Sequence, residues 1–357
     1  GLTKMIRLLF LIAFLECIFL VKSDTPANCT YEDARGEWTF LIGKKQLHYD
    51  SSLELKDNFT VVEKLKVNLL YPDKVVDQYG NIGFWTIIYN QGFEVVVNNR
   101  KFYGFFRYKG DLEHAVSICN ETSAGYTHDV LQRNWALYKA NKATPVMPKL
   151  INRRQNSNLY QENQDYVNEI NQAQNLWRAV QYPKNLGLPI LKSSKRVSSP
   201  YHYPSPKPVS PELEKLAANL PDEFDWRNVN GVNYVSPVRN QAQCGSCYSF
   251  ASAAMLEARL LIRTNKTVRA ILSPQDVVEC SPYSQGCSGG FPYLIAGKYA
   301  EDFGLAEEQC NPYKGVDGSC HTKPNCKRHY ATNYKHVGGY YAARNELQMK
   351  LALIHGR

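Results

Sequence analysis

The feature that most constrains this chain is a cysteine that is followed by a helical pattern and preceded, six residues earlier, by an amide side chain. The stretch reads Gln241-Ala-Gln-Cys-Gly-Ser-Cys-Tyr-Ser-Phe250. After Cys247 the apolar residues recur at helical spacing, at Ala251, Met255, Ala258 and Ile262. We therefore expect Cys247 at the N-terminus of a helix, whose positive end favours the reactive thiolate over the thiol. A neighbouring imidazole would complete the activation of such a nucleophile.

The Cys-x-x-Cys pattern formed by Cys244 and Cys247 has two other common uses. A redox pair requires a βαβ pattern around it, and a zinc knuckle requires a second close pair of ligands. The next cysteines are Cys280 and Cys287, and no histidine lies at ligand spacing, so we predict no metal site. The local sequence Cys-Gly-Ser-Cys-Tyr instead resembles the signature of the papain-like cysteine peptidases.

Other motifs carry the same resemblance, and within that family they point to its dipeptidyl peptidases. They are Asp225-Trp-Arg227, Val235 to Ala242, Gly286 to Tyr293 and the N-terminal Asp24-Thr-Pro-Ala-Asn-Cys-Thr-Tyr31. The last block is similar to the start of the exclusion domain that these dipeptidyl peptidases carry in addition. The resemblance implies an α+β fold with an antiparallel β-barrel exclusion domain, a partly helical propeptide and the left lobe of a papain-like domain, the right lobe being mostly missing.

A chain of 357 residues suggests two or three domains. With the resemblance we expect a signal peptide region at 1–23, the exclusion domain at 24–144, an activation propeptide at 145–219 and the N-terminal part of the peptidase domain at 220–357. In the segment 24–144, runs of β-branched and aromatic residues predict a meander of β-hairpins, and closure into a barrel would protect the edge strands. These runs are Ile82 to Tyr89, Phe93 to Val97 and Lys101 to Tyr108. His114 and His128 have no nucleophile near them in sequence and are expected to be structural.

The segment 145–219 is rich in proline and holds ten Lys and Arg against five Asp and Glu. Because this one segment contributes more than half of the net charge of +9, the charge does not indicate a nucleic-acid groove. One helix is predicted at about Leu159 to Val180, with Tyr166, Ile170, Ala173 and Trp177 on one face. The segment is an ordinary linker or, as the resemblance implies, an excisable peptide of a zymogen, cut by processing proteases near Lys195-Arg196 and other basic sites.

The N-terminus predicts a secretory signal, because Lys4 and Arg7 precede the apolar run Leu8 to Val21 and small residues allow cleavage after Ser23. This run is too short and interrupted to cross a bilayer, and no later stretch predicts a membrane span. The expected location is the secretory pathway, in the lysosome or outside the cell.

In that setting the ten cysteines are candidates for disulfides. Cys17 leaves with the signal and Cys247 must stay free, so eight remain, which spacing alone cannot pair. The resemblance implies the pairs Cys29 with Cys119, Cys244 with Cys287, Cys280 with Cys320, and Cys310 with Cys326. Four Asn-x-Ser/Thr sequons predict N-glycosylation at Asn28, Asn58, Asn120 and Asn265.

The resemblance also assigns roles to individual residues. Cys247 would be the nucleophile, and the side chain of Gln241 and the Cys247 N–H would form the oxyanion hole. Asp24, exposed by signal cleavage, would pair with the free amine of a substrate, and Gly290 would contact its second residue. The expected reaction is the sequential removal of dipeptides from free N-termini of peptides and proteins, by a thiol protease that is a tetramer when full length.

The family also implies a chloride cofactor at the second subsite, held by the backbone amides of Phe291 and Tyr293. Its pattern has a tyrosine before Val-Gly-Gly where this chain has His336. Since a neutral imidazole donates one hydrogen bond and a protonated one pairs with an anion, chloride binding stays an open prediction.

The family's catalytic His and Asn lie about 130 to 150 residues beyond the nucleophile, whereas 110 residues follow Cys247 here. We therefore expect the chain to be a fragment that is inactive by itself. The alternative is a short, non-catalytic binding or inhibitory homologue with a decoy cleft, but such a protein has no chemical need for Cys247 and Gln241. An ordinary endopeptidase is disfavoured by the block that begins at Asp24.

Overall fold

The structure is a computed structural model that describes residues 25–49, 53–110, 114–152, 163–175, 177–181 and 204–355. The predicted signal region, Asp24 and the basic pair Lys195-Arg196 lie outside the described residues.

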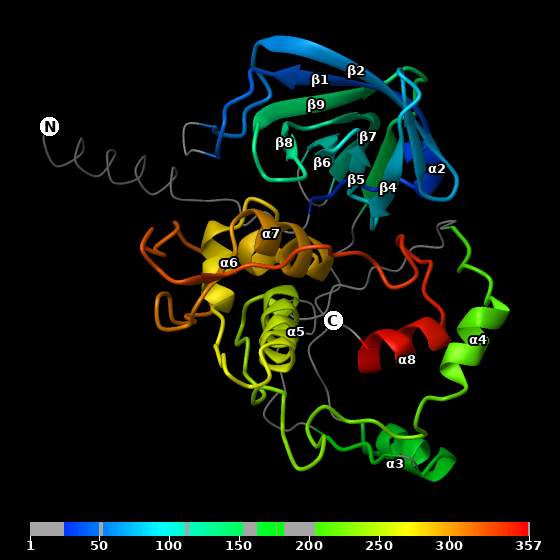
Figure 1. Ribbon diagram of the computed structural model, residues 1–357, viewed down its shortest axis with the longest axis vertical. Coiled ribbons are helices and arrows are strands. Elements are labelled where there is room, and N and C mark those ends of the chain that lie inside the picture. The colour runs from blue at the N-terminus through cyan, green and yellow to red at the C-terminus, as the bar shows by residue number, and fades with distance from the viewer. Residues whose placement is uncertain are drawn as a thin grey trace, which may run out of the picture.

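The first domain is an antiparallel β-barrel (Figure 1). Its strands follow the order β1-β2-β3-β4-β5-β6-β8-β9, and β9 pairs back onto β1, which closes the barrel with eight strands. The strands β7 and β10 extend the sheet beside β6 and β9. The bounds are β1 Gly36–Gly43, β2 Val61–Leu70, β3 Lys74–Asp77, β4 Ile82–Ile88, β5 Gly92–Val97, β6 Arg100–Lys109, β7 His114–Thr122, β8 Gly125–Asp129, β9 Ala136–Lys142 and β10 Lys149–Asn152.

Alternating side chains fill the interior of the barrel. On β1, Trp38, Phe40 and Ile42 are buried; the Trp38 ring packs against Phe93 of β5 and the Phe40 ring against Phe102 of β6, strands that do not pair with β1. A short helix, α2 (Tyr31–Ala34), lies beside the barrel and begins with a capping box. The predicted barrel is therefore present, and the three predicted strands agree with β4, β5 and β6 to within one residue at each end.

The second domain is mainly helical and lies directly below the barrel in Figure 1. Its central helix α5 packs against α6 and η4. The bounds are α5 Cys247–Arg263, α6 Pro274–Cys280, η3 Gly286–Ser288 (a 3₁₀ helix), η4 Tyr293–Tyr299 (a π-helix), α7 Ala300–Asp302, β11 Leu305–Ala306, β12 Arg328–His329 and α8 Glu346–His355. Helix α6 begins with a side-chain cap, since Ser273 Oγ accepts from the N–H of Asp276 and Pro274 is the first residue.

The buried face of α5 is not the one that carries its most regular apolar spacing. Ser249, Ser252 and Glu257 are buried, whereas Ala251 is exposed and Met255 is 39% exposed. The Glu257 carboxylate accepts hydrogen bonds from the N–H of Leu272, at 2.7 Å, and from the hydroxyl of Ser236. Glu257 is thus a buried polar contact that fixes α5 to the loop that follows it.

The helix predicted at about Leu159 to Val180 is wrong in its extent. The described helix is α3 (Gln164–Ala173), and Trp177 lies outside it with 58% of its surface exposed. The reason is local, because the Asn171 side chain hydrogen-bonds both the N–H and the carbonyl of Ala179, at 2.7 and 3.0 Å, and so ties the following chain into a turn. A further helix, α4 (Pro211–Ala217), packs beside α8.

Polar side chains buried between the barrel and the helical domain join the two. His128 of β8 lies with its Nε2 3.0 Å from both Lys298 Nζ and Asp302 Oδ1, and all three side chains are fully buried. Lys101 of β6 forms an ion pair with Glu301, at 2.5 Å. His128 is therefore structural, as expected, and it serves the contact between the domains.

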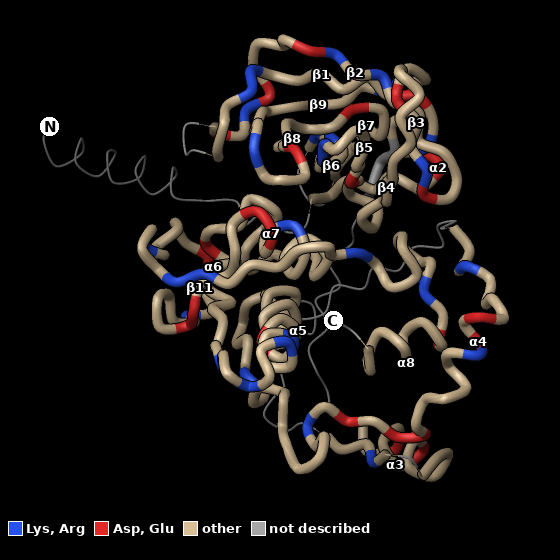
Figure 2. The backbone as a smooth tube through the Cα atoms, in the orientation of Figure 1, with Lys and Arg blue, Asp and Glu red and all other residues tan. Residues whose placement is uncertain are grey.

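Charges of both signs are spread over both domains, as Figure 2 shows. No helix in the described part of the chain is long and apolar enough to cross a membrane.

Candidate active site

Cys247 is the first residue of α5, and its side chain is exposed. It is the free thiol among the described cysteines, since all the others are in disulfides. The sulfur therefore stands at the positive end of a helix of 17 residues, where an anion is stabilised.

The other described cysteines form four bridges, and these are the pairs that the resemblance implied: Cys29–Cys119, Cys244–Cys287, Cys280–Cys320 and Cys310–Cys326. The bridge from Cys244 lies close in sequence to Cys247. Together with the hydrogen bond from Gly245 N–H to the Cys287 carbonyl, at 2.8 Å, it fixes the loop before α5 to the loop at η3.

Gln241 lies in this loop and is half-buried. Its Nε2 donates to the carbonyl of Cys244 at 2.7 Å, so the amide is turned toward the start of α5. The next residue, Ala242, has a positive φ of 53°, and its N–H donates to Asn240 Oδ1 at 2.8 Å. The loop therefore holds Gln241 in a tight turn that an alanine adopts at some cost.

Gly290 lies where the chain passes the ring of Tyr248. A Cβ atom at this position would come within 2.7 to 2.9 Å of the ring. The ring is buried, and its hydroxyl donates to the Gly286 carbonyl at 2.9 Å. Glycine is therefore required at 290 by a close approach, and the bare backbone is available for a hydrogen bond to a ligand.

The residues predicted to bind chloride lie together at the start of η4. Phe291 is buried, and the ring of Tyr293 stacks on the imidazole of His336 with 4.1 Å between centroids. Burial and the charge of Arg344 lower the pKa of His336 to about 4. Its Nε2 atom is buried and has no hydrogen-bond partner among the described residues.

This arrangement fits a small anion. The N–H of Tyr293 is the first of η4 and has no partner within the helix, whereas those of Leu294 and Ile295 donate to the Phe291 carbonyl, at 3.0 and 3.1 Å. An N–H of a neutral imidazole can add a further donor. A histidine at position 336, where the family pattern has a tyrosine, therefore still offers a hydrogen-bond donor beside Tyr293.

Glu94 belongs to the same region and was missed by the sequence reasoning. It projects from β5 of the barrel, is buried, and accepts hydrogen bonds from the hydroxyls of Tyr293, at 2.7 Å, and Tyr334. Burial raises the pKa of both phenols well above its usual value, and the charge of Glu94 adds to this effect. A signal was available, because Glu94 is the one charged residue in the apolar run of β5.

No histidine in the described ranges forms a hydrogen bond with Cys247. His321 and His329 instead contact carboxylates, at 3.1 Å from Glu279 and 2.9 Å from Glu307. The predicted amine-binding residue, Asp24, lies outside the described residues, but the chain that follows it is firmly placed. The Thr25 hydroxyl donates to Gln91 at 2.7 Å, and Ala27 and Cys29 are fully buried in the barrel domain.

A free cysteine at the start of a central helix, bridged loops around it and a barrel packed on the same domain together define the class, a papain-type cysteine peptidase with an added β-barrel. The comparisons agree, since residues 24–142 match the cathepsin C exclusion domain and residues 220–356 match the papain family cysteine protease domain. Over 96% of its length the chain is 43% identical to cathepsin C of Schistosoma mansoni, and it covers 77% of that protein. The chain therefore belongs to the cathepsin C family.

Other relatives match a smaller share of the chain. Cathepsin Z of Onchocerca volvulus is 43% identical over 30% of this chain and 36% of that protein. Among solved structures, the procathepsin L2 proteinase of Tenebrio molitor is 37% identical over 29% of this chain and 32% of that one, with a TM-score of 0.27.

Proposed function

We propose that this chain carries the nucleophile of a cysteine-type dipeptidyl peptidase. The observation that carries the proposal is the free, exposed thiol of Cys247 at the start of α5, in a part of the chain whose other described cysteines are all bridged. The thiolate attacks the peptide carbonyl, and the Gln241 amide and the Cys247 N–H stabilise the resulting oxyanion. An imidazole would pass the proton from the thiol to the leaving amine.

Restriction to dipeptides is proposed to come from the barrel domain and its N-terminus. A free carboxylate at Asp24 would pair with the ammonium group of the substrate's first residue. The anchoring of Thr25, Ala27 and Cys29 supports this role, because it limits how far Asp24 can lie from the barrel. The substrates are peptides and proteins with free N-termini.

We further propose that chloride binds at Phe291, Tyr293 and His336. The buried, unpartnered Nε2 of His336 supports this assignment. The anion would order the base of the second subsite and supply no covalent chemistry. A chloride titration followed by the NMR signals of His336 tests it, with a rise in the imidazole pKa expected as chloride increases.

The remaining proposals concern maturation and location. The disulfides and the membership of a cathepsin family support passage through the secretory pathway, and we propose the lysosome or the extracellular space as its end. Synthesis as a zymogen cut in 145–219 by processing proteases, and assembly of the full-length enzyme as a tetramer, are proposed from the family. Of the four sequons, Asn58 and Asn265 are exposed in the structure, whereas Asn28 and Asn120 are half-buried.

The experiment expresses the full open reading frame that encodes this chain and compares a dipeptide amide with its N-acetylated form. We expect turnover of the free amine only, and loss of turnover in Cys247→Ser. Asp24→Asn should raise KM for the free amine at least tenfold, because one charge pair is lost. Equal turnover of both substrates would refute dipeptidyl specificity, and undiminished turnover in Cys247→Ser would refute Cys247 as the nucleophile. Absence of turnover in the wild-type enzyme would favour the binding or inhibitory role.

A further inference from the structure

Ser246, directly before the nucleophile, does not act as the cap that its position predicts. A serine at the N-cap usually has extended backbone angles and accepts a hydrogen bond from the second or third N–H of its helix. Here the angles are φ −98° and ψ 17°, and the side chain makes no cap hydrogen bond. Its Oγ lies instead 2.6 Å from the hydroxyl oxygen of Tyr313, 67 residues away in sequence.

Tyr313 also reaches the other side of the nucleophile loop. Its hydroxyl donates to the backbone carbonyl of Gln241 at 2.7 Å. Because the phenol has one proton and donates it to Gln241, the hydroxyl of Ser246 is the donor in the contact with Tyr313. The hydroxyl oxygen of Tyr313 thus links two residues of the loop before α5. One is Gln241, whose side-chain amide is proposed for the oxyanion hole, and the other is Ser246.

The phenol is itself held in place. The Tyr313 ring packs edge-on against Phe250 of α5 with 4.7 Å between centroids, and the backbone N–H of Tyr313 donates to Glu308 at 2.9 Å. Glu308 forms an ion pair with Arg239, at 2.7 Å, and Arg239 lies over the ring of Phe250. Burial raises the pKa of the Tyr313 phenol above its ordinary value of 10, so at neutral pH it is protonated and able to donate.

The peptide plane between residues 246 and 247 is rigid, so ψ of Ser246 sets the direction of the Cys247 N–H. If the Ser246 side chain turned back to cap α5, the residue would move toward the extended region and this plane would rotate. Resting on the proposed function, we propose that Tyr313 is a positioning residue for the oxyanion hole. Its hydrogen bond with the Ser246 hydroxyl holds Ser246 at its observed backbone angles, and so aims the Cys247 N–H beside the Gln241 amide.

The test is Tyr313→Phe in the full-length enzyme, with a dipeptide amide as substrate. Loss of one oxyanion donor lowers kcat by about 10² to 10³, so misplacing one should lower it by about 10- to 100-fold. KM should change less than about twofold, since the donors act on the transition state. The inhibition constant of a dipeptide aldehyde should rise in parallel with the fall in kcat/KM, while the alkylation rate of Cys247 by iodoacetamide, read by peptide mapping, should stay within about twofold.

The matched control is Tyr126→Phe in the barrel, because the hydroxyl of this buried tyrosine also donates to a backbone carbonyl, that of Leu53, at 2.9 Å. It should leave kcat unchanged. Ser246→Ala is the second variant and carries the test if Tyr313→Phe does not fold. It should lower kcat to a similar degree, and the double variant should be no worse than either single one.

Two negative results are distinguishable. If the wild-type enzyme does not turn over the dipeptide amide, the proposed function fails. If the wild type is active and both Tyr313→Phe and Ser246→Ala behave like Tyr126→Phe, the positioning role of Tyr313 is overturned while the peptidase assignment stands.

Discussion

At the scale of single residues, Gly290 has the clearest requirement. A methyl group at this position meets the Tyr248 ring at 2.7 to 2.9 Å, and the ring cannot move away easily because it is buried and hydrogen-bonded. We expect Gly290→Ala to lower the free energy of unfolding by about 1–3 kcal/mol, measured by urea denaturation. Gly318→Ala is the control, since its Cβ would meet nothing closer than 3.4 Å. Similar losses in both variants would contradict this reading.

His336 makes stability depend on pH. Its pKa is about 4 in the folded chain, against an ordinary value of 6.5. As the pH falls from about 6.5 to 4, the unfolded chain takes up a proton that the folded chain does not, so the free energy of unfolding decreases. The decrease should be about 3 kcal/mol at most, and His336→Phe should lack it. The two proteins are compared by urea denaturation at fixed chloride concentration, and parallel pH profiles would refute the assignment.

The site residues that the sequence could suggest are those that belong to a short, recognisable motif. Cys247 and Gln241 stand in one short motif, and Gly290 lies in another. Tyr313 could not be predicted, because its contacts to Ser246 and Gln241 span 67 and 72 residues. The motif names the reacting groups, but only the folded chain shows what holds them.

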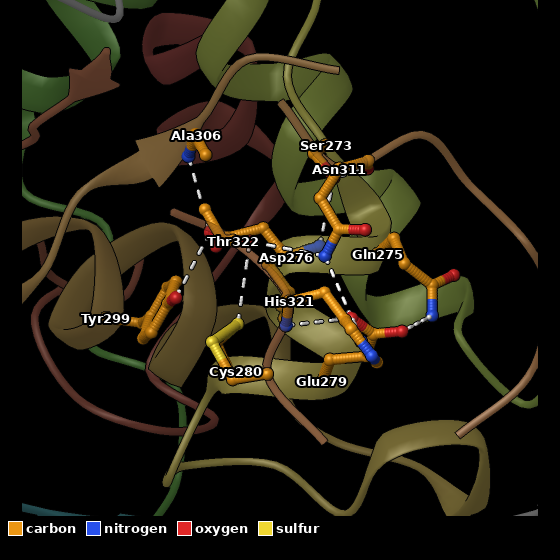
Figure 3. Close-up of a disulfide and its surroundings, with 12 residues drawn as sticks. Ser273, Gln275, Asp276, Glu279, Cys280, Tyr299, Ala306, Asn311, His321 and Thr322 are labelled. Carbon is orange, nitrogen blue, oxygen red and sulfur yellow. Dashed lines mark hydrogen bonds and ion pairs between the residues drawn. A yellow bond between two sulfur atoms is a disulfide. The ribbon is translucent and has the colours of Figure 1, made fainter. Parts of the chain in front are cut away.

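At the scale of elements, Asp276 joins α6 to both strands of the small sheet. Its buried carboxylate forms an ion pair with Arg328 of β12, at 2.9 Å. It also accepts hydrogen bonds from the Tyr299 hydroxyl and from the N–H of Ala306 in β11, which the close-up in Figure 3 shows. Nearby, Glu279 of the same helix contacts Asn311 and His321 beside the Cys280 bridge. Helix α6 is thus fixed by charge as well as by its cap.

We expect Arg328→Leu to lower the free energy of unfolding by about 3–5 kcal/mol, because it leaves a buried carboxylate without its cation. The double variant Asp276→Asn/Arg328→Leu should lose less than the sum of the single losses. Thermal and urea unfolding of the four proteins check this double-mutant cycle. Additive losses would show that the two side chains do not act as a pair.

The helices and strands show which elements the sequence pattern predicts and which it does not. Strands β4 to β6 were predictable because each is a run rich in β-branched and aromatic residues, and such residues favour strands. The buried face of α5 was not, because Ser249 and Glu257 are buried with hydrogen bonds to Pro274 and Leu272, which the sequence does not place beside the helix. The end of α3 was missed for the same kind of reason, since a side chain, Asn171, binds the backbone of Ala179.

At the scale of the whole molecule, the position of the barrel on the peptidase domain depends on buried charge. Burial alone would raise the pKa of Asp302, but the attraction of Lys298 and hydrogen bonds from His128 and Tyr283 outweigh it and hold the pKa well below its usual value. An aspartate with a lowered pKa stabilises the folded protein above its unfolded pKa, near 3.8, and loses this effect only as the pH falls through the folded value. The contact between the domains should therefore persist from neutral pH down to about pH 4.

Lys298 is the residue on which this contact can be tested. Lys298→Met removes the cation that lies 2.9 Å from the Asp302 carboxylate and leaves that carboxylate buried beside His128. Because an unpaired buried charge costs about 3–5 kcal/mol, the barrel should separate from the helical domain before either domain unfolds. Calorimetry should then show two transitions in place of one, and small-angle scattering should show a larger radius of gyration between them. Lys335→Met, at an exposed lysine of the same domain, is the control. A single unshifted transition in Lys298→Met would mean that the apolar contacts between the domains are sufficient without the buried charges.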